Sequence, residues 1–371
     1  MTNPFQDLAA SGVKGLRPYQ PGKPISELER EYGVRNIIKL ASNENPLGPS
    51  PQVLKSIEAA LNDLALYPDG SGFELRQALT AYHDIGPEFI TLGNGSNDIL
   101  VLLAEAFLTP DYEAVFSEYA FAVYPLAVQA TGATARVSKS RSSSDEMPLG
   151  HDLDAMRQLI NDKTRLVYLA NPNNPTGTWL ETEQLKAFVA DVPGNTIVVI
   201  DEAYCDYVEQ PAYPDATTWL EEFPNLVVTR TFSKIYGLAG MRIGYALADP
   251  GITDILNRIR QPFNVNSLAL VAAEASLKDK QHVFRSRDMN NRELHRLAAA
   301  CEELGIASLP SIGNFILADF GRPALPIFEA LLRNAIIVRP VGNYGLPNHL
   351  RITIGRPEQN DRLITALKKV L

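Results

Sequence analysis

The sequence predicts an α/β protein in which helices cover a mostly parallel sheet, with a smaller α+β domain beside it. Helix-period segments alternate with short β-rich runs between about residues 75 and 250, which is the rhythm of parallel βαβ units. Several of these runs are apolar on both faces, as a buried sheet requires. The length of 371 residues exceeds that of one ordinary domain and leaves room for a second unit.

The individual strands of the sheet are predicted from six short β-rich runs. In chain order they occupy residues 89–94, 113–118, 165–172, 196–204, 226–233 and 242–249. The segments between them have a helical period, which supports a helical crossover from one strand to the next.

The C-terminal part of the chain has a different pattern. Residues 266–304 keep a helical period without a break and stop at Gly305, a residue type common just after a helix. Shorter strands follow at 315–320, 335–341 and 350–355, before a last amphipathic helix at 357–371. The predicted organisation is an N-terminal arm, poor in periodicity and rich in Pro and Gly, then a large domain, then a connecting helix with a small domain; the ranges are 1–40, 41–265 and 266–371.

Composition argues against several classes of partner. The net charge is −9, and no dense basic cluster offers a site for a nucleic-acid backbone. The longest apolar runs are about half as long as a membrane span requires, and the N-terminal segment lacks a secretory apolar region, so we expect a cytoplasmic protein without a membrane partner. The two cysteines and five histidines form neither a disulfide framework nor a metal-ligand spacing, so no metal is expected.

One predicted strand end is suited to bind an anion. Ligands of open α/β sheets bind beyond the carboxyl ends of the strands. The strand at 89–94 runs into the sequence GSNDILVLLAEAFL, a glycine-bracketed turn that opens a helix and aims backbone N–H groups at any anion placed there. A phosphate fits this turn, although Gly93 and Gly95 could equally serve a tight turn alone. The dinucleotide pattern GxGxxG is absent, because Asp98 stands where its third glycine is needed.

Two other strand ends carry reactive side chains. Asp201 follows an apolar strand, where a carboxylate is costly to hold ionised unless a cation or strong donors meet it. The alternative is an aspartate that caps a following helix. Lys234 follows the sequence VVTRTFS, and a lysine beside apolar strands tends toward a lowered pKa and can act as an amine nucleophile. The alternative is an ordinary solvated lysine.

Taken together, these strand ends predict one kind of site. Tyr204 stands three residues after Asp201, and Asn174 lies in the turn NPNNPTG that ends the strand at 165–172. An amine nucleophile, a carboxylate, such a Tyr and Asn pair and a phosphate-binding turn are what a Schiff-base pyridoxal phosphate site requires. The aldehyde of this cofactor needs the lysine, its ring nitrogen needs the carboxylate, and its phosphate needs N–H groups, hydroxyls and an arginine. The sequence therefore predicts pyridoxal 5′-phosphate as the cofactor.

Several motifs also carry a family resemblance. The sequences PNNPTG, DEAY and TFSK, the last followed by Arg242, resemble the signature of the fold-type I pyridoxal-phosphate-dependent aminotransferases, and their spacings agree over most of the chain. Within this family, the sequences LRPYQPGKP, ASNENPLGPS, YPDGSG and LRITIGRPEQN resemble those of the histidinol-phosphate aminotransferases. The resemblance implies the fold-type I fold, with a large pyridoxal-phosphate-binding domain, and a homodimer with shared active sites.

The resemblance also implies a reaction. A transaminase of this kind interconverts histidinol phosphate and 2-oxoglutarate with imidazole acetol phosphate and glutamate, a step in histidine biosynthesis. The alternatives on the same fold are an aromatic amino acid aminotransferase and a phosphothreonine decarboxylase. A non-catalytic binding protein is a third possibility, but the presence of both Lys234 and Asp201 argues against it.

Each residue that matches the family motifs acquires an implied role. Lys234 forms the Schiff base with the cofactor and later moves a proton, and Asp201 pairs with the ring nitrogen. Tyr204 and Asn174 hydrogen-bond the phenolic oxygen of the ring. The residues implied around the cofactor phosphate are Ser96, Asn97, Ser233, Arg242 and, from the neighbouring subunit, Tyr67.

The residue that stacks on the cofactor ring is less clearly marked. The resemblance points to Tyr119, but this tyrosine lacks the preceding sequence PTY that is common in the family, and extra residues separate it from Tyr124. Phe121 is the alternative stacking residue.

The substrate end is predicted from two arginines of the small domain. Arg339 and Arg351 lie in apolar strand contexts, where an unpaired guanidinium is expensive to bury and a bound anion relieves that cost. Ion pairs within the protein are the alternative. The resemblance implies that Arg351 binds the α-carboxylate of glutamate in one half-reaction and the substrate phosphate in the other. Arg339 and Tyr19 would complete this anion pocket, and Asn43 is also placed at the substrate.

Overall fold

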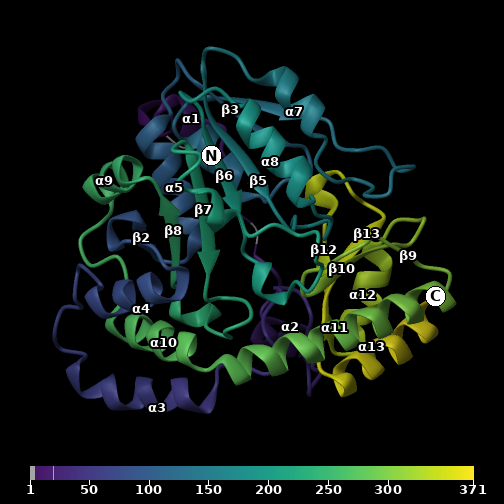
Figure 1. Ribbon diagram of the computed structural model, residues 1–371. Coiled ribbons are helices and arrows are strands. Elements are labelled where there is room, and N and C mark those ends of the chain that lie inside the picture. The colour runs from purple at the N-terminus through teal and green to yellow at the C-terminus, as the bar shows by residue number, and fades with distance from the viewer. Residues whose placement is uncertain (1–4, 20) are drawn as a thin grey trace.

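A seven-stranded sheet forms the centre of the larger part of the molecule, in a computed structural model that describes residues 5–19 and 21–371 (Figure 1). The strand order is β2-β8-β7-β6-β5-β3-β4. All neighbours from β7 to β4 pair in parallel, whereas β8 is antiparallel to both β7 and β2. The strands are β2 (Ile90–Gly93), β3 (Glu113–Ser117), β4 (Thr134–Ser138), β5 (Thr164–Ala170), β6 (Ile197–Asp201), β7 (Leu226–Thr231) and β8 (Gly244–Ala248).

The prediction of a mostly parallel sheet is confirmed, with one strand missed and one direction reversed. Each of the six predicted strands is present, although several are shorter than expected. The missed strand, β4, lies at the edge and is mostly exposed, so it lacks the apolar pattern of its neighbours. β8 runs antiparallel to β7, and the loop that joins them contains the 3-10 turn Ala239–Met241 in place of the crossover helix that usually joins parallel strands.

Two sets of helices cover the two faces of this sheet, because successive strand residues point to opposite sides. Val198 and Ile200 of β6 pack in one apolar cluster, and Val199 between them packs in the other. The first cluster contains side chains from α3 (Pro51–Ala60), α4 (Phe73–His83), α7 (Leu153–Leu159), α8 (Thr182–Asp191) and α10 (Ser267–Lys278). The second contains side chains from α5 (Ser96–Phe107), α6 (Val123–Ala130) and α9 (Pro250–Ile259).

A four-stranded antiparallel sheet organises the C-terminal part, in the order β12-β13-β10-β9. A separate parallel pair joins β1 to β11. The strands are β1 (Ile38–Lys39), β9 (Ala307–Ser308), β10 (Phe315–Asp319), β11 (Ile336–Ile337), β12 (Arg339–Pro340) and β13 (His349–Thr353). Helices α11 (Lys280–Glu303), α12 (Leu325–Arg333) and α13 (Pro357–Val370) pack around these strands, on the right in Figure 1.

The helix predicted across residues 266–304 is in fact two helices. α10 ends at Lys278 and α11 begins at Lys280, and the carboxylate of Asp279 between them accepts a hydrogen bond from the backbone N–H of His282. An aspartate at this position is a good N-cap, so it starts a new helix inside a continuous helical pattern. The junction carries the chain from the large sheet to the C-terminal sheet (Figure 1).

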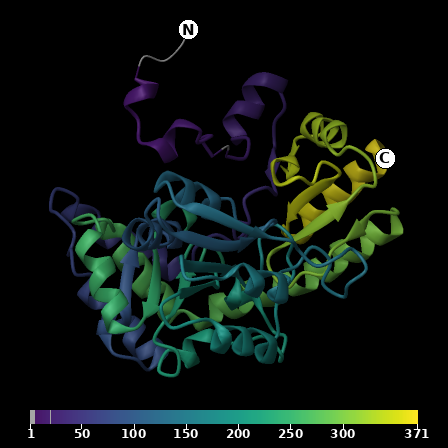
Figure 2. The same cartoon turned by 90° about the horizontal axis from the view of Figure 1, so that it is seen from above.

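The N-terminal segment contains more regular structure than its composition predicts. It forms the 3-10 turn η1 (Gln6–Leu8), the short helix α1 (Ser11–Lys14) and the helix α2 (Ile25–Tyr32). Leu28 of α2 packs with Leu332 and Ile337 of the C-terminal part. α1, by contrast, lies beside α6 of the larger part, on the upper side in Figure 2. The predicted boundaries at residues 40 and 265 remain predictions.

Within residues 5–19 and 21–371, no helix combines the length and the apolar character that crossing a bilayer demands.

Candidate active site

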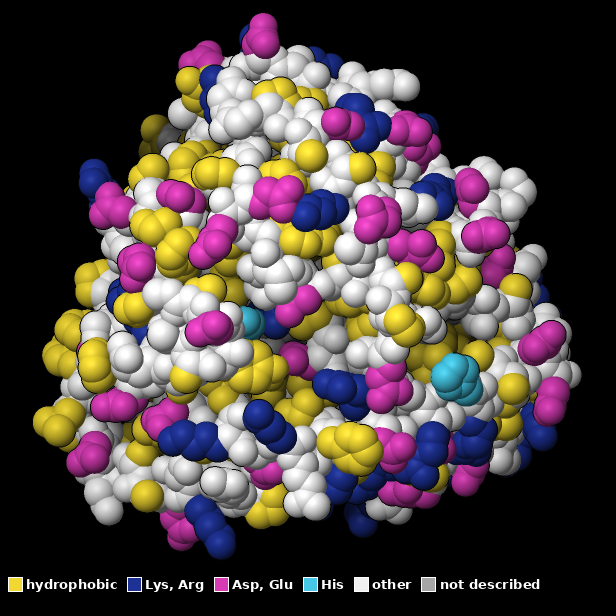
Figure 3. Space-filling model, viewed as in Figure 1, with side chains coloured by type: hydrophobic (Ala, Val, Ile, Leu, Met, Phe, Trp, Pro, Cys, Tyr) yellow, Lys and Arg dark blue, Asp and Glu magenta, His cyan; other side chains and the backbone are white. Residues whose placement is uncertain are grey.

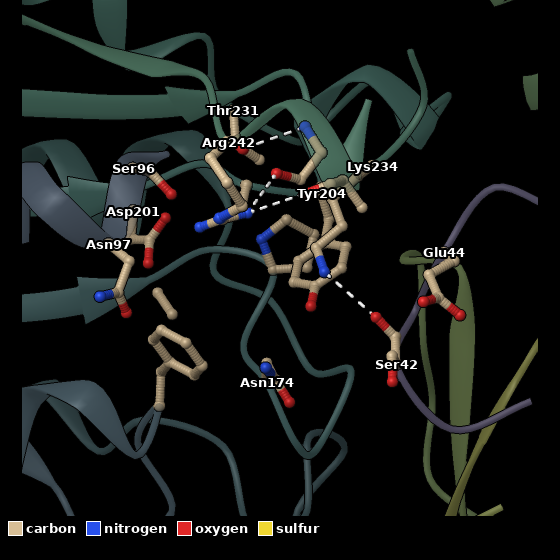
Figure 4. A pocket seen from close by; sticks show the side chains of 16 residues that line it. Ser42, Glu44, Ser96, Asn97, Asn174, Asp201, Tyr204, Thr231, Lys234 and Arg242 are labelled. Carbon is tan, nitrogen blue, oxygen red and sulfur yellow. Dashed lines mark hydrogen bonds between the residues drawn. The ribbon is translucent and has the colours of Figure 1, made fainter. Parts of the chain in front are cut away.

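A cavity of about 270 Å³ opens where β5, β6 and β7 end and α5 begins (Figure 4). This is the edge of the sheet at which an open α/β fold binds ligands. The predicted residues that line it are Ser96, Asn97, Asn174, Asp201, Tyr204, Ser233, Lys234 and Arg242. The other residues that line it are Ser42, Glu44, Phe121, Ala170, Pro172, Ala203, Thr231 and Ala239. The structure therefore brings eight of the predicted site residues together in one cavity.

Lys234 enters the cavity from the loop after β7. Its amine donates a hydrogen bond of 3.4 Å to the carbonyl oxygen of Ser42 and lies 5.5 Å from the centre of the Tyr204 ring. Burial, assisted by the positive charge of Arg351, lowers the pKa of Lys234 to about 8. The amine therefore gives up its proton far more readily than a solvated lysine, as a nucleophile requires.

Asp201 ends β6 and is only 5% exposed. Its Oδ2 accepts a hydrogen bond of 3.0 Å from the Tyr124 hydroxyl, and its Oδ1 accepts one of 3.2 Å from the Thr229 hydroxyl. Burial raises the pKa of Asp201, while these two donors and the nearby Lys234 act to lower it. The carboxylate is thus met by strong donors at the cavity wall, where it can pair with a protonated ring nitrogen.

Tyr204 is fixed by a hydrogen-bonded chain from two other segments. Its hydroxyl accepts a hydrogen bond of 2.9 Å from the Asn43 side-chain amide. The backbone N–H of Asn43 donates to the Thr353 hydroxyl, and that hydroxyl donates to Asn43 Oδ1. Because all three side chains are buried, Tyr204 is held in one orientation at the cavity wall. Asn43 was predicted at the substrate, and the structure shows it in contact with Tyr204.

Asn174 and Arg351 connect the two parts of the molecule beside the cavity. Arg351 Nη1 donates a hydrogen bond of 2.6 Å to Asn174 Oδ1, and Nη2 donates one of 2.7 Å to the carbonyl oxygen of Ala41. With its carbonyl oxygen engaged, Asn174 turns its amide nitrogen toward the cavity (Figure 4). Within the described part of the chain, the buried Nε of Arg351 has no hydrogen-bond partner.

The two predicted anion-binding arginines face each other across the C-terminal sheet. Arg339 of β12 is the cross-strand partner of Arg351 of β13. Burial and the charge of Arg339 lower the pKa of Arg351, while Tyr204, Tyr344 and Tyr19 act to raise it. Like charges directly opposite each other destabilise a sheet, so an anion bound between them would relieve the repulsion.

The opposite end of the cavity carries hydrogen-bond donors of the kind that a phosphate accepts. Ser96 and Asn97 open α5, where backbone N–H groups have no intrahelical acceptor. Arg242 donates a hydrogen bond of 3.4 Å to the Ser233 hydroxyl and points toward the same region (Figure 4). The chain comes so close here that a Cβ atom on Gly95 would lie 2.5 Å from Arg242 Nη2. Gly95 has a φ of 82°, so its conformation favours glycine, whereas the Arg242 side chain could move to make room for a Cβ atom.

The side chains around the cavity can be compared with the chemical groups of the predicted cofactor. Hydroxyl, amide and guanidinium donors surround one end of the cavity, a buried carboxylate stands at its wall, and an amine with a lowered pKa reaches into it. This donor set matches the phosphate, ring nitrogen and aldehyde of pyridoxal phosphate. The residues present fit the group.

The structure places the two candidate stacking residues differently. Phe121 lines the cavity, whereas Tyr119 packs against the apolar cluster of Leu317, Val341 and Leu346 on the C-terminal part. The backbone of Tyr119 is held there by a hydrogen bond of 2.9 Å from the Asn173 side-chain amide to its carbonyl oxygen. This arrangement favours the alternative, Phe121, and the identity of the stacking residue stays a prediction.

Two other predicted residues lie away from the cavity in this chain. Tyr67 is 83% exposed, and its ring stacks on that of Phe263 with the centres 4.8 Å apart. Tyr19 is 51% exposed and lies with its ring 5.8 Å from the guanidinium carbon of Arg339. Neither position tests the predicted role. Tyr67 was expected to act in the site of a neighbouring subunit. Tyr19 was expected beside Arg339, where it lies, but the anion that the two would bind is itself a prediction.

Sequence reasoning missed the donors to Asp201. Thr229 of β7 lies opposite Asp201 of β6 in the parallel pair. The register of two paired strands cannot be predicted from one sequence. Tyr124 comes from α6, whose placement against β6 depends on tertiary packing. The one available signal was the cost of burying Asp201, which required donors without identifying them.

The chain matches a protein-family model and a named relative over most of its length. The family model described as aminotransferase class I and II matches residues 35–367. Histidinol-phosphate aminotransferase 2 of Methylococcus capsulatus is 54% identical over 364 residues, and the match covers 98% of each chain.

Two solved structures resemble the chain over most of its length. The histidinol-phosphate aminotransferase of Sinorhizobium meliloti, solved in complex with pyridoxal 5′-phosphate, matches with a TM-score of 0.89 and 30% identity, covering 97% of this chain and 96% of that one. The L-threonine-O-3-phosphate decarboxylase of Porphyromonas gingivalis matches with a TM-score of 0.77 and 25% identity, covering 90% of this chain and 99% of that one.

Proposed function

Because the chain belongs to the class I and II aminotransferase family, we propose that it is a pyridoxal-phosphate-dependent transaminase acting on histidinol phosphate. The reaction exchanges histidinol phosphate and 2-oxoglutarate for imidazole acetol phosphate and glutamate, a step of histidine biosynthesis. The observation that carries the reaction class is the meeting of Lys234, Asp201 and the start of α5 in one cavity. The choice of substrate is supported by the 54% full-length identity to the M. capsulatus relative.

The residues proposed to hold the cofactor divide by the part they would bind. Ser96, Asn97, Ser233 and Arg242 would hold the phosphate, Asp201 the ring nitrogen, and Tyr204 and Asn174 the phenolic oxygen. Phe121 would cover the ring face. When bound, pyridoxal phosphate supplies an electron sink that makes the substrate α-proton acidic.

Lys234 is proposed as the residue that moves this proton. Its amine removes the proton from the substrate α-carbon and afterwards gives that proton up again. An amine of lowered pKa can both accept and donate a proton in this way. Ser42 and Tyr204 keep the amine in place through the 3.4 Å hydrogen bond and the nearby ring.

Arg351 and Arg339 are proposed as the anion site for both substrates. Glutamate presents carboxylates and histidinol phosphate presents a phosphate, and both groups accept the planar two-pronged contact of a guanidinium. The Nε of Arg351 has no partner among residues 5–19 and 21–371, which supports this role, because a buried donor without an acceptor is costly until a ligand supplies one. Tyr19 on the N-terminal arm would close the pocket over Arg339.

We also propose a cytoplasmic homodimer with shared sites. Exposed apolar side chains gather along α3, α4 and the chain between them, at the left edge of the face in Figure 3; they are Leu54, Leu61, Leu64, Leu66, Tyr67 and Phe73. A patch of this kind is typical of a protein–protein interface. The Tyr67 hydroxyl would then reach the cofactor phosphate of the partner subunit.

Replacing Tyr67 by phenylalanine tests the shared site. We expect Tyr67→Phe to weaken cofactor binding by about 0.5 to 1.5 kcal/mol, or up to about 3 kcal/mol if the bond is to the charged phosphate, because one hydrogen bond is lost. In a mixed dimer of Lys234→Ala and Tyr67→Phe chains, one site should carry both defects and the other neither. Equal impairment of both sites would contradict sharing.

A substrate comparison tests the proposed function itself. Histidinol phosphate, phenylalanine and tyrosine are assayed with 2-oxoglutarate as acceptor, and O-phosphothreonine is assayed for decarboxylation. We expect the highest kcat/KM with histidinol phosphate. A preference for an aromatic amino acid, or release of CO₂ from phosphothreonine, would replace the proposal with an aminotransferase of different specificity or with a decarboxylase.

A further inference from the structure

Tyr124 occupies an unusual position behind the cavity wall. It comes from α6 and is completely buried, and its hydroxyl donates a hydrogen bond of 3.0 Å to Asp201 Oδ2. It is not among the residues that line the cavity. The polar group that it brings to the site acts through Asp201, which its hydroxyl contacts.

The ring of Tyr124 is held in place on more than one side. It stacks on the ring of Tyr168, with the centres 4.8 Å apart and the planes 12° from parallel. Phe121, which lines the cavity, packs edge-on against it at 5.9 Å. The hydroxyl thus has little freedom to turn away from Asp201.

The Tyr124 hydroxyl also keeps its proton. Burial and the adjacent Asp201 raise the pKa of Tyr124 well above its usual value, so the phenol is neutral near neutral pH. A neutral phenol beside an ionised carboxylate is a permanent donor. Such a charge-assisted hydrogen bond is about twice as strong as one between neutral groups.

Asp201 depends on this donor. Burial alone drives its carboxyl toward the neutral form, and the side chains that face it are Tyr124, Thr229, Lys234 and Tyr204. Tyr124 and Thr229 each engage one oxygen, while Lys234 acts from a distance. Once the lysine amine is neutral, the two hydroxyls and the backbone N–H of Ala203 are the support that remains for the negative charge.

We propose that Tyr124 is a positioning residue that keeps Asp201 ionised and correctly oriented toward the ring nitrogen of the cofactor. This inference rests on the proposed cofactor site and deepens it, since it assigns a task to a side chain outside the cavity. Through Asp201, Tyr124 sets how firmly the ring nitrogen holds its proton. The same carboxylate, with a weaker donor behind it, would leave the ring less positive.

The experiment replaces Tyr124 by phenylalanine, which keeps the ring stack and removes only the hydroxyl. The dissociation constant for pyridoxal phosphate is measured by equilibrium titration without substrate, and we expect it to rise about tenfold, as for the loss of one hydrogen bond to a charged group. The absorption of the bound cofactor is then followed against pH. Its midpoint should move to higher pH, because a less positive ring makes the nitrogen joined to Lys234 more basic.

Tyr168→Phe is a matched control. Tyr168 is also completely buried in the same stack, but its hydroxyl donates to the carbonyl oxygen of Leu100, away from Asp201. Thermal unfolding of both cofactor-free variants shows whether each is folded. We expect Tyr168→Phe to leave the absorption midpoint at the wild-type pH, even if it lowers stability as much as Tyr124→Phe does.

Two results would overturn the inference. One is a Tyr124→Phe protein with the wild-type absorption midpoint and cofactor affinity, and the other is an equal shift of that midpoint in Tyr168→Phe. If Tyr124→Phe does not fold, Thr229→Val serves as the second variant, since it removes the donor to the other oxygen of Asp201, and an unmoved midpoint there also contradicts the role assigned to these donors. Because no substrate is used, an incorrect substrate assignment does not affect any of these outcomes.

Discussion

Lys234→Ala should abolish transamination, with kcat lowered by about 10⁴-fold or more, while the protein still binds pyridoxal phosphate noncovalently. A positioned general base alone contributes about 10² to 10⁴-fold, and this lysine is expected to supply the covalent attachment as well. No other amine lines the cavity within the described residues, so no neighbour can take over either task. Cofactor binding should persist because the proposed phosphate and ring contacts come from other side chains.

Reduction with borohydride identifies the lysine directly. In the wild-type protein loaded with cofactor, reduction followed by peptide mapping should label Lys234. Lys139→Ala is a suitable control, because the side chain of Lys139 is 86% exposed and its change should leave activity intact. A label on any other lysine would show that the assignment is wrong.

The lowered pKa of Lys234 gives a second, independent measurement. In the cofactor-free protein, an amine-reactive reagent should label Lys234 with a midpoint near pH 8, because the amine reacts only in its neutral form. Below that pH the protonated amine is protected, and above it the rate should level off. A midpoint close to that of an exposed lysine would mean that the side chain is solvated and unsuited to the proposed role.

The cofactor end of the site was largely predictable from sequence because its chemistry is concentrated at strand ends. Lys234, Asp201 and the turn before α5 each follow an apolar run. Burying their polar groups there costs free energy unless a ligand pairs with them, and ligands of α/β sheets bind at such strand ends. Local patterns of this kind survive in a single sequence. The order of the motifs then narrowed the choice to one cofactor.

Contacts made between distant segments could not be predicted in the same way. The bond from Asn43 to Tyr204 joins residues 161 positions apart, and the bond from Arg351 to Asn174 joins residues 177 apart. Tyr119 and Phe121 are two residues apart in one loop, so only the fold decides which ring faces the cavity. The apolar pattern of β8 likewise does not indicate its direction, which is antiparallel to β7.

Arg351→Lys should damage both half-reactions, lowering the catalytic efficiency of each by about 10 to 100-fold. A charge-assisted hydrogen bond contributes about 1.5 to 3 kcal/mol, and a lysine offers a point charge in place of the planar fork that fits a carboxylate or a phosphate. The guanidinium is already oriented by Asn174 and the Ala41 carbonyl, and its Nε has no partner in the part of the chain that the structure describes. A lysine cannot make those contacts and a two-pronged contact with the substrate at the same time.

Single-turnover kinetics of each half-reaction, measured separately, provide the decisive comparison. Arg356→Lys is the matched control, because Arg356 is an exposed arginine nearby that pairs with Glu358, and its change should leave both rates intact. Tyr19→Phe should differ from both by raising mainly the KM for the phosphorylated substrate. Cofactor affinity, measured alongside, separates a loss at the substrate from a loss at Asn174. If Arg351→Lys impairs only the glutamate half-reaction and leaves the histidinol phosphate half-reaction intact, the phosphate is bound elsewhere, and an amino acid aminotransferase or a decarboxylase becomes the better assignment.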